Sequence, residues 1–167
     1  MIHPLRASRK IPAFWHLPVR EKLWLFLLYP YSGLIRAAVL LTPFHLLSKH
    51  LGTYYKNTEL SPLVDEQQLA LARQVGRICE ITARYTPWQS KCLVQAIMAR
   101  TVLAFYAIPY VIHLGASLSN NPQKPIEAHA WVKVGHLVIT GRAGHKTYPV
   151  LSSFVAPQIL NHQRYNE

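Results

Sequence analysis

The hydrophobic positions along the first third of the chain predict helices. Val19–Tyr29 and Ser32–Leu41 are strongly apolar, and Pro30 between them interrupts helical hydrogen bonding, so we expect two short helices. Pro43 closes the second helix. No apolar run here reaches the length of a membrane-spanning helix, because the prolines and Arg36 interrupt it. We therefore expect this segment to be buried within the fold, with peripheral contact to a membrane as the alternative.

A stretch rich in turn-forming residues follows these helices. Leu51–Pro62 contains glycine, asparagine, serine and proline, a composition typical of a linker. We therefore place a domain boundary here. A helical, basic and hydrophobic N-terminal subdomain is expected in residues 1–56, and a second domain in residues 57–167.

Two more helices are predicted at the start of the second domain. Val64–Tyr85 carries apolar residues at nearly helical spacing, and Thr86-Pro87 ends it, because a residue before proline resists the helical conformation. Lys91–Ala107 has an apolar stripe of its own, and we expect Ser90 to cap its start.

After Pro109 the pattern changes from helical to extended. Tyr110–Leu114, Glu127–Val134 and Leu137–Thr140 are rich in β-branched and aromatic residues, which predicts strands. Gly135-His136 fits the tight turn of a hairpin. Helices followed by an antiparallel sheet place the chain in the α+β class.

Composition and charge narrow the classes of partner. The chain has 167 residues, half of them apolar, and its formal net charge is +11. A basic surface suits nucleic acid, anionic lipid or an acidic peptide. The sequence contains no zinc-finger spacing, no RNA-binding sheet signature and no lysine-rich tail, so we expect no nucleic-acid partner.

The cysteines indicate a reducing compartment. Cys79 and Cys92 are too few for a disulfide framework and lack the Cys-x-x-Cys spacing, so we expect neither a metal nor a cofactor. The N-terminal stretch has no unbroken apolar core and no small-residue cleavage site, so we do not expect it to be a secretory signal. We therefore expect a cytoplasmic protein. Its apolar segment also allows association with a membrane.

Cys92 is the candidate nucleophile. If Ser90 caps the helix, Cys92 occupies the second helical position, where unpaired N–H groups and the helix dipole favour negative charge on sulfur. The thiolate is the nucleophilic form of cysteine, and the same N–H groups can hold an oxyanion. An inert thiol is the alternative at this position. Cys79, within the preceding helix, is expected to be a small buried side chain.

His129 is the candidate base. Alternate residues of a strand share a face, which puts His129 beside Trp131 on the more polar face of its strand, as in the wall of a cleft. A solvated histidine is the alternative. A cysteine on a helix followed by a histidine on a strand is the order of a papain-type site. Gln89 is a weaker candidate for an oxyanion donor, and Trp88 and Trp131 for a substrate groove or the core.

Several segments together resemble one family. Ala128–Val132 is similar to the histidine motif of lasso-peptide leader peptidases, often called the B proteins, and the family's other segments occur in the same order along this chain. The further resembling segments are Leu23–Gly52, Pro87–Ala96 with the cysteine, Tyr110–Ser117 and Val138–Phe154. The likeness covers nearly the whole chain, and the order and spacing of the motifs make it specific.

The resemblance implies a transglutaminase-like core with a Cys-His-Asp site, in which Cys92 and His129 are the catalytic pair. Such enzymes remove the leader of a ribosomally made precursor so that a macrolactam synthetase can close the ring. Fused members carry a further domain that binds the leader. This chain resembles the stand-alone peptidases, so we expect the leader peptide, a separate leader-recognition protein and the synthetase as partners.

The third member of the family's site is missing from this sequence. The family's aspartate follows the histidine by about a dozen residues, but here that neighbourhood is Thr140-Gly141, and no aspartate occurs after Asp65. A backbone carbonyl near Thr140, the Thr140 hydroxyl or Glu127 can take its place. Each neutral group stabilises an imidazolium less than a carboxylate does. The alternatives to a peptidase are an acyl transferase of transglutaminase type and a non-catalytic leader- or membrane-binding module.

Overall fold

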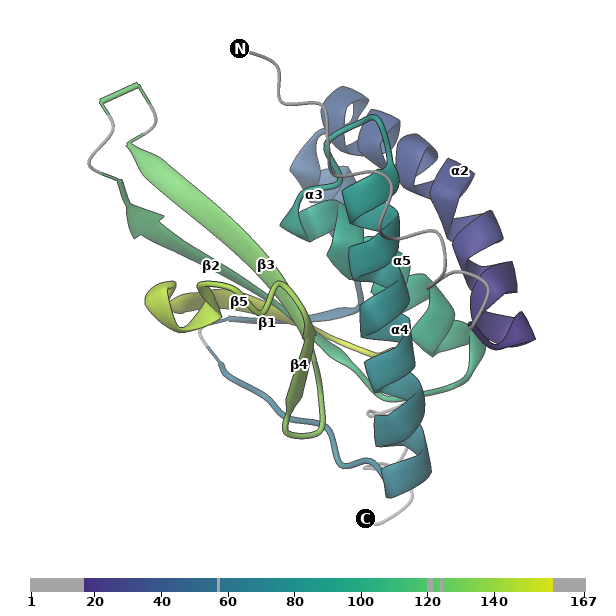
Figure 1. Ribbon diagram of the computed structural model, residues 1–167. Helices are drawn as coiled ribbons and strands as arrows, with labels where there is room; N and C mark the ends of the chain where they lie inside the picture. Colours follow the sequence, from purple (N-terminus) through teal and green to yellow (C-terminus); the bar gives the residue numbers. More distant parts are fainter. Residues whose placement is uncertain (1–16, 57, 120–121, 124, 158–167) are drawn as a thin grey trace.

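Helices and a sheet occupy opposite sides of the molecule in the computed structural model, which describes residues 17–56, 58–119, 122–123 and 125–157 (Figure 1). The five-stranded sheet is antiparallel at each of its pairings, in the order β1-β5-β2-β3-β4. The helices are α2 (Val19–Leu41), α3 (Phe44–Ser48), α4 (Glu66–Tyr85), α5 (Cys92–Phe105) and the 3-10 turn η1 (His145–Thr147). The strands are β1 (Thr53–Lys56), β2 (Val111–Leu118), β3 (Ile126–Val134), β4 (Leu137–Thr140) and β5 (Val150–Val155). The predicted α+β class is confirmed.

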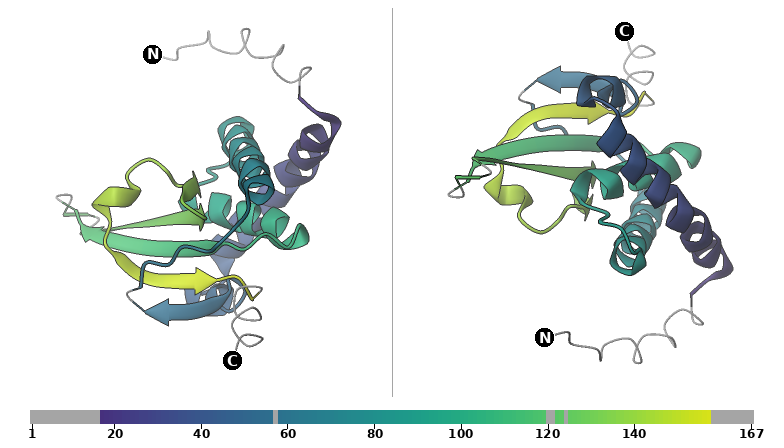
Figure 2. Two further views of the ribbon diagram at one scale, coloured as in Figure 1. Left: turned by 90° about the horizontal axis from the view of Figure 1, so that it is seen from below. Right: turned by 90° about the horizontal axis from the view of Figure 1, so that it is seen from above.

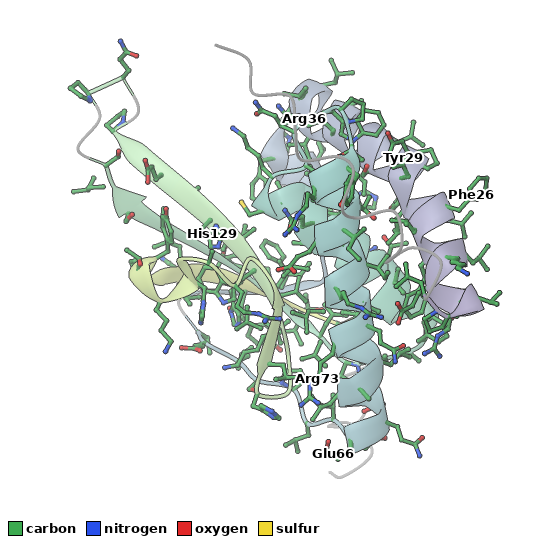
Figure 3. All side chains as sticks on the ribbon, viewed as in Figure 1. Phe26, Tyr29, Arg36, Glu66, Arg73 and His129 are labelled. Atoms are coloured by element: carbon green, nitrogen blue, oxygen red, sulfur yellow. The ribbon has the colours of Figure 1, made fainter. Side chains whose placement is uncertain are left out.

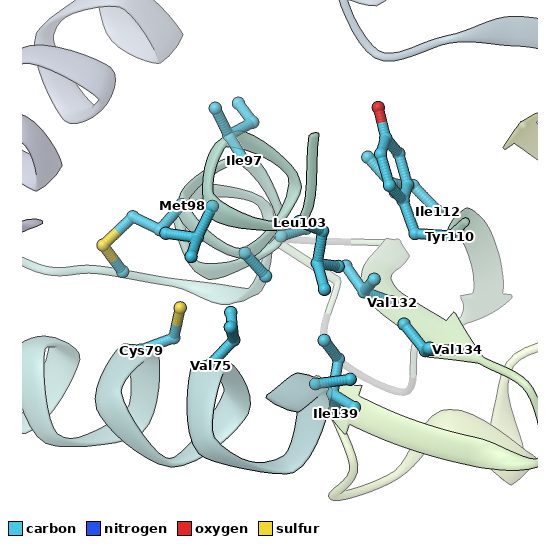
Figure 4. Close-up of a cluster of buried hydrophobic side chains, with 14 of the residues drawn as sticks. Val75, Cys79, Ile97, Met98, Leu103, Tyr110, Ile112, Val132, Val134 and Ile139 are labelled. Carbon is cyan, nitrogen blue, oxygen red and sulfur yellow. The ribbon is translucent and has the colours of Figure 1, made fainter. Parts of the chain in front are cut away.

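The elements form three layers. Helices α4 and α5 pack against the sheet, and α2 lies across them on the side away from it (Figures 1 and 2). The core between α4, α5 and the sheet is closely packed, with Val75, Met98 and Val132 among its fully buried side chains (Figure 4). Cys79 lies in this core, as predicted, and its burial raises the pKa of the thiol to about 12.

The prediction of two buried helices around Pro30 is wrong. Val19–Leu41 is one helix with Pro30 inside it, and it ends before Pro43 as expected. A proline removes a single helical donor, and here Leu28 before it and Ile35 after it are buried in the same core, which holds both halves in one helix. Pro30 itself is exposed, and so is most of the helix face around it.

The predicted linker is wrong in its first part. Thr53–Lys56 forms β1 and pairs with β5, with Thr53 opposite Val155. The predicted boundary between residues 56 and 57 therefore falls at the end of a strand of the common sheet. The N-terminal helix also shares the core, because Trp24 of α2 belongs to the same buried cluster as the residues of α4, α5 and the sheet.

Helix α4 is fixed at its start and along its face. Asp65 accepts a hydrogen bond from the Gln68 backbone N–H at 2.8 Å, and the Gln68 side chain returns one at 3.1 Å, which forms a capping box. Gly76 permits close packing on β4, because a Cβ there would lie 2.4 Å from the Ile139 carbonyl oxygen. The helix ends at the Thr86 cap, as predicted.

The sheet presents His129 as the sequence predicts. Strands β3 and β4 form the expected hairpin, with Gly135 at a φ of 55° in its turn. Ala130 and Val132 face the helices and are buried, whereas His129 and Trp131 share the other face of β3. β2 continues to Leu118, further than predicted.

His113 is a buried histidine that joins the segment before α4 to the sheet. Its Nε2 lies 3.1 Å from the Leu60 carbonyl oxygen, and its Nδ1 lies 2.7 Å from Oγ of Ser153. Burial lowers the pKa of His113, an effect that exceeds the opposing influence of the Leu60 hydrogen bond and the Glu59 charge. The folded protein therefore favours the neutral ring.

We expect this burial to make the fold sensitive to acid. The unfolded chain takes up the proton first as the pH falls, so the contribution of His113 is complete above pH about 6.5 and is lost as the pH falls through the lowered pKa. Urea unfolding at several pH values measures this loss of stability. His113→Phe should be less stable at neutral pH but show a flatter decline below it, whereas His136→Gln, at an exposed turn position, should keep the wild-type slope. Equal slopes in all three proteins would contradict the assignment.

Candidate active site

Cys92 is the first residue of α5. The helix begins one residue later than predicted: Lys91 occupies the N-cap position, and its side chain makes no capping hydrogen bond. Ser90 is not the cap, because its Oγ lies 3.1 Å from Oγ1 of Thr86 and its carbonyl accepts from Nε2 of Gln95 at 2.9 Å. The first helical bond runs from the Gln95 N–H to the Lys91 carbonyl, so the N–H groups of Cys92 and the two following residues lie before the helical ladder begins.

The position of Cys92 suits a nucleophile. The thiol is half-buried at the positive end of the helix dipole, where negative charge on sulfur is stabilised. The free backbone N–H groups of the same turn are donors for an oxyanion. Among the described residues, neither His129 nor another side chain forms a hydrogen bond with the sulfur.

His129 is oriented by a backbone carbonyl. Its Nε2 lies 2.7 Å from the carbonyl oxygen of Gly141. A carbonyl oxygen only accepts, so Nε2 carries the hydrogen and donates it. In the neutral ring this leaves the lone pair on Nδ1, which is then the nitrogen able to take a proton. Of the three orienting groups that the sequence allows, the backbone carbonyl is the one that contacts the imidazole.

Gly141 can present its carbonyl because it is a glycine. Its φ is 68°, in the left-handed region, and a Cβ at this position would lie 2.2 Å from the carbonyl oxygen of Ala130. Thr140, just before it, is buried, and its Oγ1 has no hydrogen-bond partner among the described residues. Glu127 instead accepts hydrogen bonds from Oη of Tyr148 at 3.3 Å and from Oγ of Ser119 at 3.2 Å.

Two aromatic rings pack against the imidazole of His129. The Trp131 ring lies 5.9 Å from it and the Tyr148 ring 5.2 Å, both nearly parallel to it. Gly115, opposite His129 on β2, makes room for this packing, because a Cβ there would lie 2.7 Å from the Pro149 carbonyl oxygen and 2.8 Å from Cβ of Tyr148. Trp131 was predicted for the groove or the core, and it is buried. Tyr148 lies in the resembling segment Val138–Phe154 but was not predicted as part of the site.

Tyr148 stacks on His129, and its phenol also responds to the charge of Cys92. Partial burial raises the pKa of its phenol, and the negative charges of Glu127 and of the Cys92 thiolate raise that pKa further. Cys92 is therefore within electrostatic reach of the ring that stacks on His129. The charge of Cys92 thus acts on the tyrosine that stacks on His129, although Cys92 and His129 are 37 positions apart in the chain.

The remaining candidates lie elsewhere. Trp88 donates from Nε1 to Oγ of Ser32 at 2.9 Å and packs on Gly33, so it anchors α2. Gln89 is exposed in the loop before α5. In the described part of the chain, no group of three or more His, Cys, Asp or Glu side chains could hold a metal ion.

A family comparison decides the membership of the chain. The model of the transglutaminase-like superfamily matches residues 38–153, which is more than half of the sequence. The chain belongs to the transglutaminase-like superfamily. This superfamily includes cysteine peptidases and acyl transferases, and its fold is typically enzymatic. Neither the curated proteins nor the solved structures give a match.

The superfamily match includes both candidate catalytic residues and the orienting Gly141. It extends from the last turn of α2 to β5, and so includes β1, which the sequence pattern had placed in a linker. Most of α2 precedes the matched region. The transglutaminase-like unit of this protein is thus the sheet with α4 and α5, and α2 packs on the outside of it.

Native alkylation should distinguish the two cysteines. Iodoacetamide at neutral pH should modify Cys92 at least about tenfold faster than Cys79, because the thiolate reacts and burial keeps Cys79 protonated. Peptide mass spectrometry after a short exposure measures both rates, and denatured protein provides the control in which both react. A Cys92 that reacts no faster than Cys79 in the native protein would contradict its assignment as a nucleophile.

The role of the Gly141 carbonyl can be tested with a matched pair of glycine variants. Gly141→Ala should destabilise the fold by about 1–3 kcal/mol through backbone strain and displace the carbonyl from His129. Gly144→Ala has a similar positive φ of 83°, but its nearest neighbour would be 3.6 Å away, so it reports the strain alone. Alkylation of Cys92 should slow in the first variant only. Equal slowing of alkylation in both variants would show that the Gly141 carbonyl does not control the reactivity of Cys92.

Proposed function

We propose that this protein is a cysteine peptidase that removes the leader from a lasso-peptide precursor before macrolactam formation. The observation that carries the proposal is the hydrogen bond from Nε2 of His129 to Gly141, because it leaves Nδ1 free to act as the base. The position of Cys92 at the start of α5 supports it, and so does superfamily membership. The leader as substrate is supported by the resemblance of the cysteine and histidine motifs to those of the B proteins.

The proposed reaction uses one nucleophile and one base. Nδ1 of His129 takes the thiol proton of Cys92, and the thiolate attacks the last carbonyl of the leader. The unpaired N–H groups at the start of α5 hold the oxyanion. The imidazolium returns its proton to the departing core amine, which leaves the leader as a thioester. Water, deprotonated by the same nitrogen, then releases the leader as a free carboxylate.

The partners follow from the same resemblance. A separate leader-recognition protein delivers the precursor, and the macrolactam synthetase receives the free core amine. Both act in the cytoplasm, where a thiol nucleophile remains reduced.

Cleavage of a lasso-peptide precursor, whose gene we expect to lie beside that of this protein, tests the proposal. With the leader-recognition protein present, Cys92→Ala and His129→Ala should each lower the rate by about a thousandfold or more, because nucleophile and base act as one unit. Cys79→Ala and the exposed His136→Ala are the matched controls and should remain active. Circular dichroism confirms the fold of each variant. Cleavage by Cys92→Ala at the wild-type rate would overturn the peptidase.

The products separate the proposal from its alternatives. Hydrolysis gives a core peptide with a free amine, whereas an acyl transferase joins the acyl group to an amine and gives a cross-link, which mass spectrometry detects. A precursor that is bound but never cleaved, together with an unreactive Cys92, would indicate a non-catalytic leader-binding module.

A further inference from the structure

Helix α2 exposes an apolar face that no described element covers. Phe26 is 76% exposed and Leu41 is 83% exposed, and the Phe26 side chain points away from α4 and α5 (Figure 3). The exposed positions recur every three or four residues, so they form a continuous stripe along the helix. We call the following residues the outer face of α2: Val19, Leu23, Phe26, Leu27, Pro30, Leu34, Ala37 and Leu41.

The opposite face of α2 is fixed to the rest of the protein. Glu21 is buried and forms an ion pair with Arg77 of α4, and Ser32 accepts the hydrogen bond of Trp88. Trp24 is buried in the core. Contrary to the sequence prediction, α2 is long and apolar enough to cross a membrane, by length and composition only. Crossing would break these polar contacts, so a membrane can receive only the outer face.

The positive charge of the N-terminal third favours anionic lipid as the partner that covers the outer face. Within the described residues 17–56, five lysines and arginines occur with a single acidic residue, Glu21, which Arg77 neutralises. A second copy of the chain would bring the same positive charge to the interface. An anionic lipid surface offers apolar depth for the outer face and negative charge for its basic surroundings.

A cavity next to the outer face is also mainly apolar, with a positive charge in its wall. It measures about 350 Å³ and lies between α2, α3 and α5, with Leu34 of the outer face in its wall. Its lining is mainly aliphatic but includes Arg100, whose Nε is buried without a hydrogen-bond partner among the described residues. An apolar cavity with a guanidinium in its wall suits an anionic amphiphile better than an uncharged protein surface.

We propose that α2 is an in-plane membrane anchor that binds the protein to anionic lipid through its outer face. The helix lies parallel to the membrane, with the outer face at the boundary between headgroups and acyl chains and the rest of the fold above it. This inference does not depend on the chemistry of Cys92 and His129, so a catalytically inactive variant should bind lipid as the wild type does.

Vesicle flotation of the full chain tests the anchor. The protein should float with vesicles that contain phosphatidylcholine and phosphatidylglycerol in equal shares, and far less with phosphatidylcholine alone. Phe26→Glu should lower the partition coefficient about tenfold or more, since it removes a large apolar side chain from the interface and adds a repelled charge. Leu118→Glu, at a similarly exposed position on the sheet, is the matched control and should bind as the wild type does.

Each other outcome would overturn the anchor. Equal binding to both kinds of vesicle would show that charge does not select the lipid, and loss of binding in the Leu118 control as well would show that the outer face is not its site. Light scattering after gel filtration reveals dimers. Dimers that Phe26→Glu dissociates, without vesicle binding by the wild type, would make a second copy the occupant of this face.

Discussion

The hydrogen bond between His129 and the carbonyl of Gly141 joins the sheet to the proposed chemistry. It requires β3 and β4 to pair as a hairpin, because only that pairing brings the end of β4 alongside His129. It also requires a residue that adopts a positive φ against the backbone of β3, which is why a glycine occupies the position. The orientation of one imidazole thus depends on backbone geometry, and no acidic side chain of the described residues bonds to it.

A carbonyl and a carboxylate orient a histidine in the same way but differ in charge. Either group accepts from Nε2 and fixes the tautomer that leaves Nδ1 as the base. A carboxylate also stabilises the imidazolium that forms during the reaction, which a neutral carbonyl does less well. Glu127 is acidic and close, but its oxygens bond to Tyr148 and Ser119. The candidate site therefore has a neutral acceptor, the Gly141 carbonyl, where the resemblance implies an aspartate.

Sequence patterns predicted the elements that depend on local preference. The hairpin around Gly135, the end of α4 at Thr86 and the face shared by His129 and Trp131 all follow from short-range rules. β1 was missed because four residues at a sheet edge are held by β5, a partner about one hundred positions away. Pro30 was misread for a similar reason, since buried residues on both sides of it outweigh one lost helical bond.

Sequence patterns predicted which residues belong to the candidate site but not which contacts they make. Periodicity places Cys92 near a helix start and His129 on a strand, whereas the stacking of Tyr148 on the imidazole arises from a loop with no regular pattern. The choice of Gly141 among three orienting groups depends on a φ angle and on packing against Ala130. Such features are set when the sheet assembles, so no single segment of sequence contains them.

Helix α2 is apolar on its exposed side as well as on its buried side, and this links the proposed anchor to the proposed site. A helix on a protein surface usually buries its apolar face and exposes its polar one. In α2 the polar Glu21 and Ser32 are buried, and large apolar residues such as Phe26 are exposed. Ser32 is bonded to Trp88, only four positions before Cys92. A surface that receives α2 would therefore hold the start of α5, and the thiol on it, in a fixed orientation to that surface.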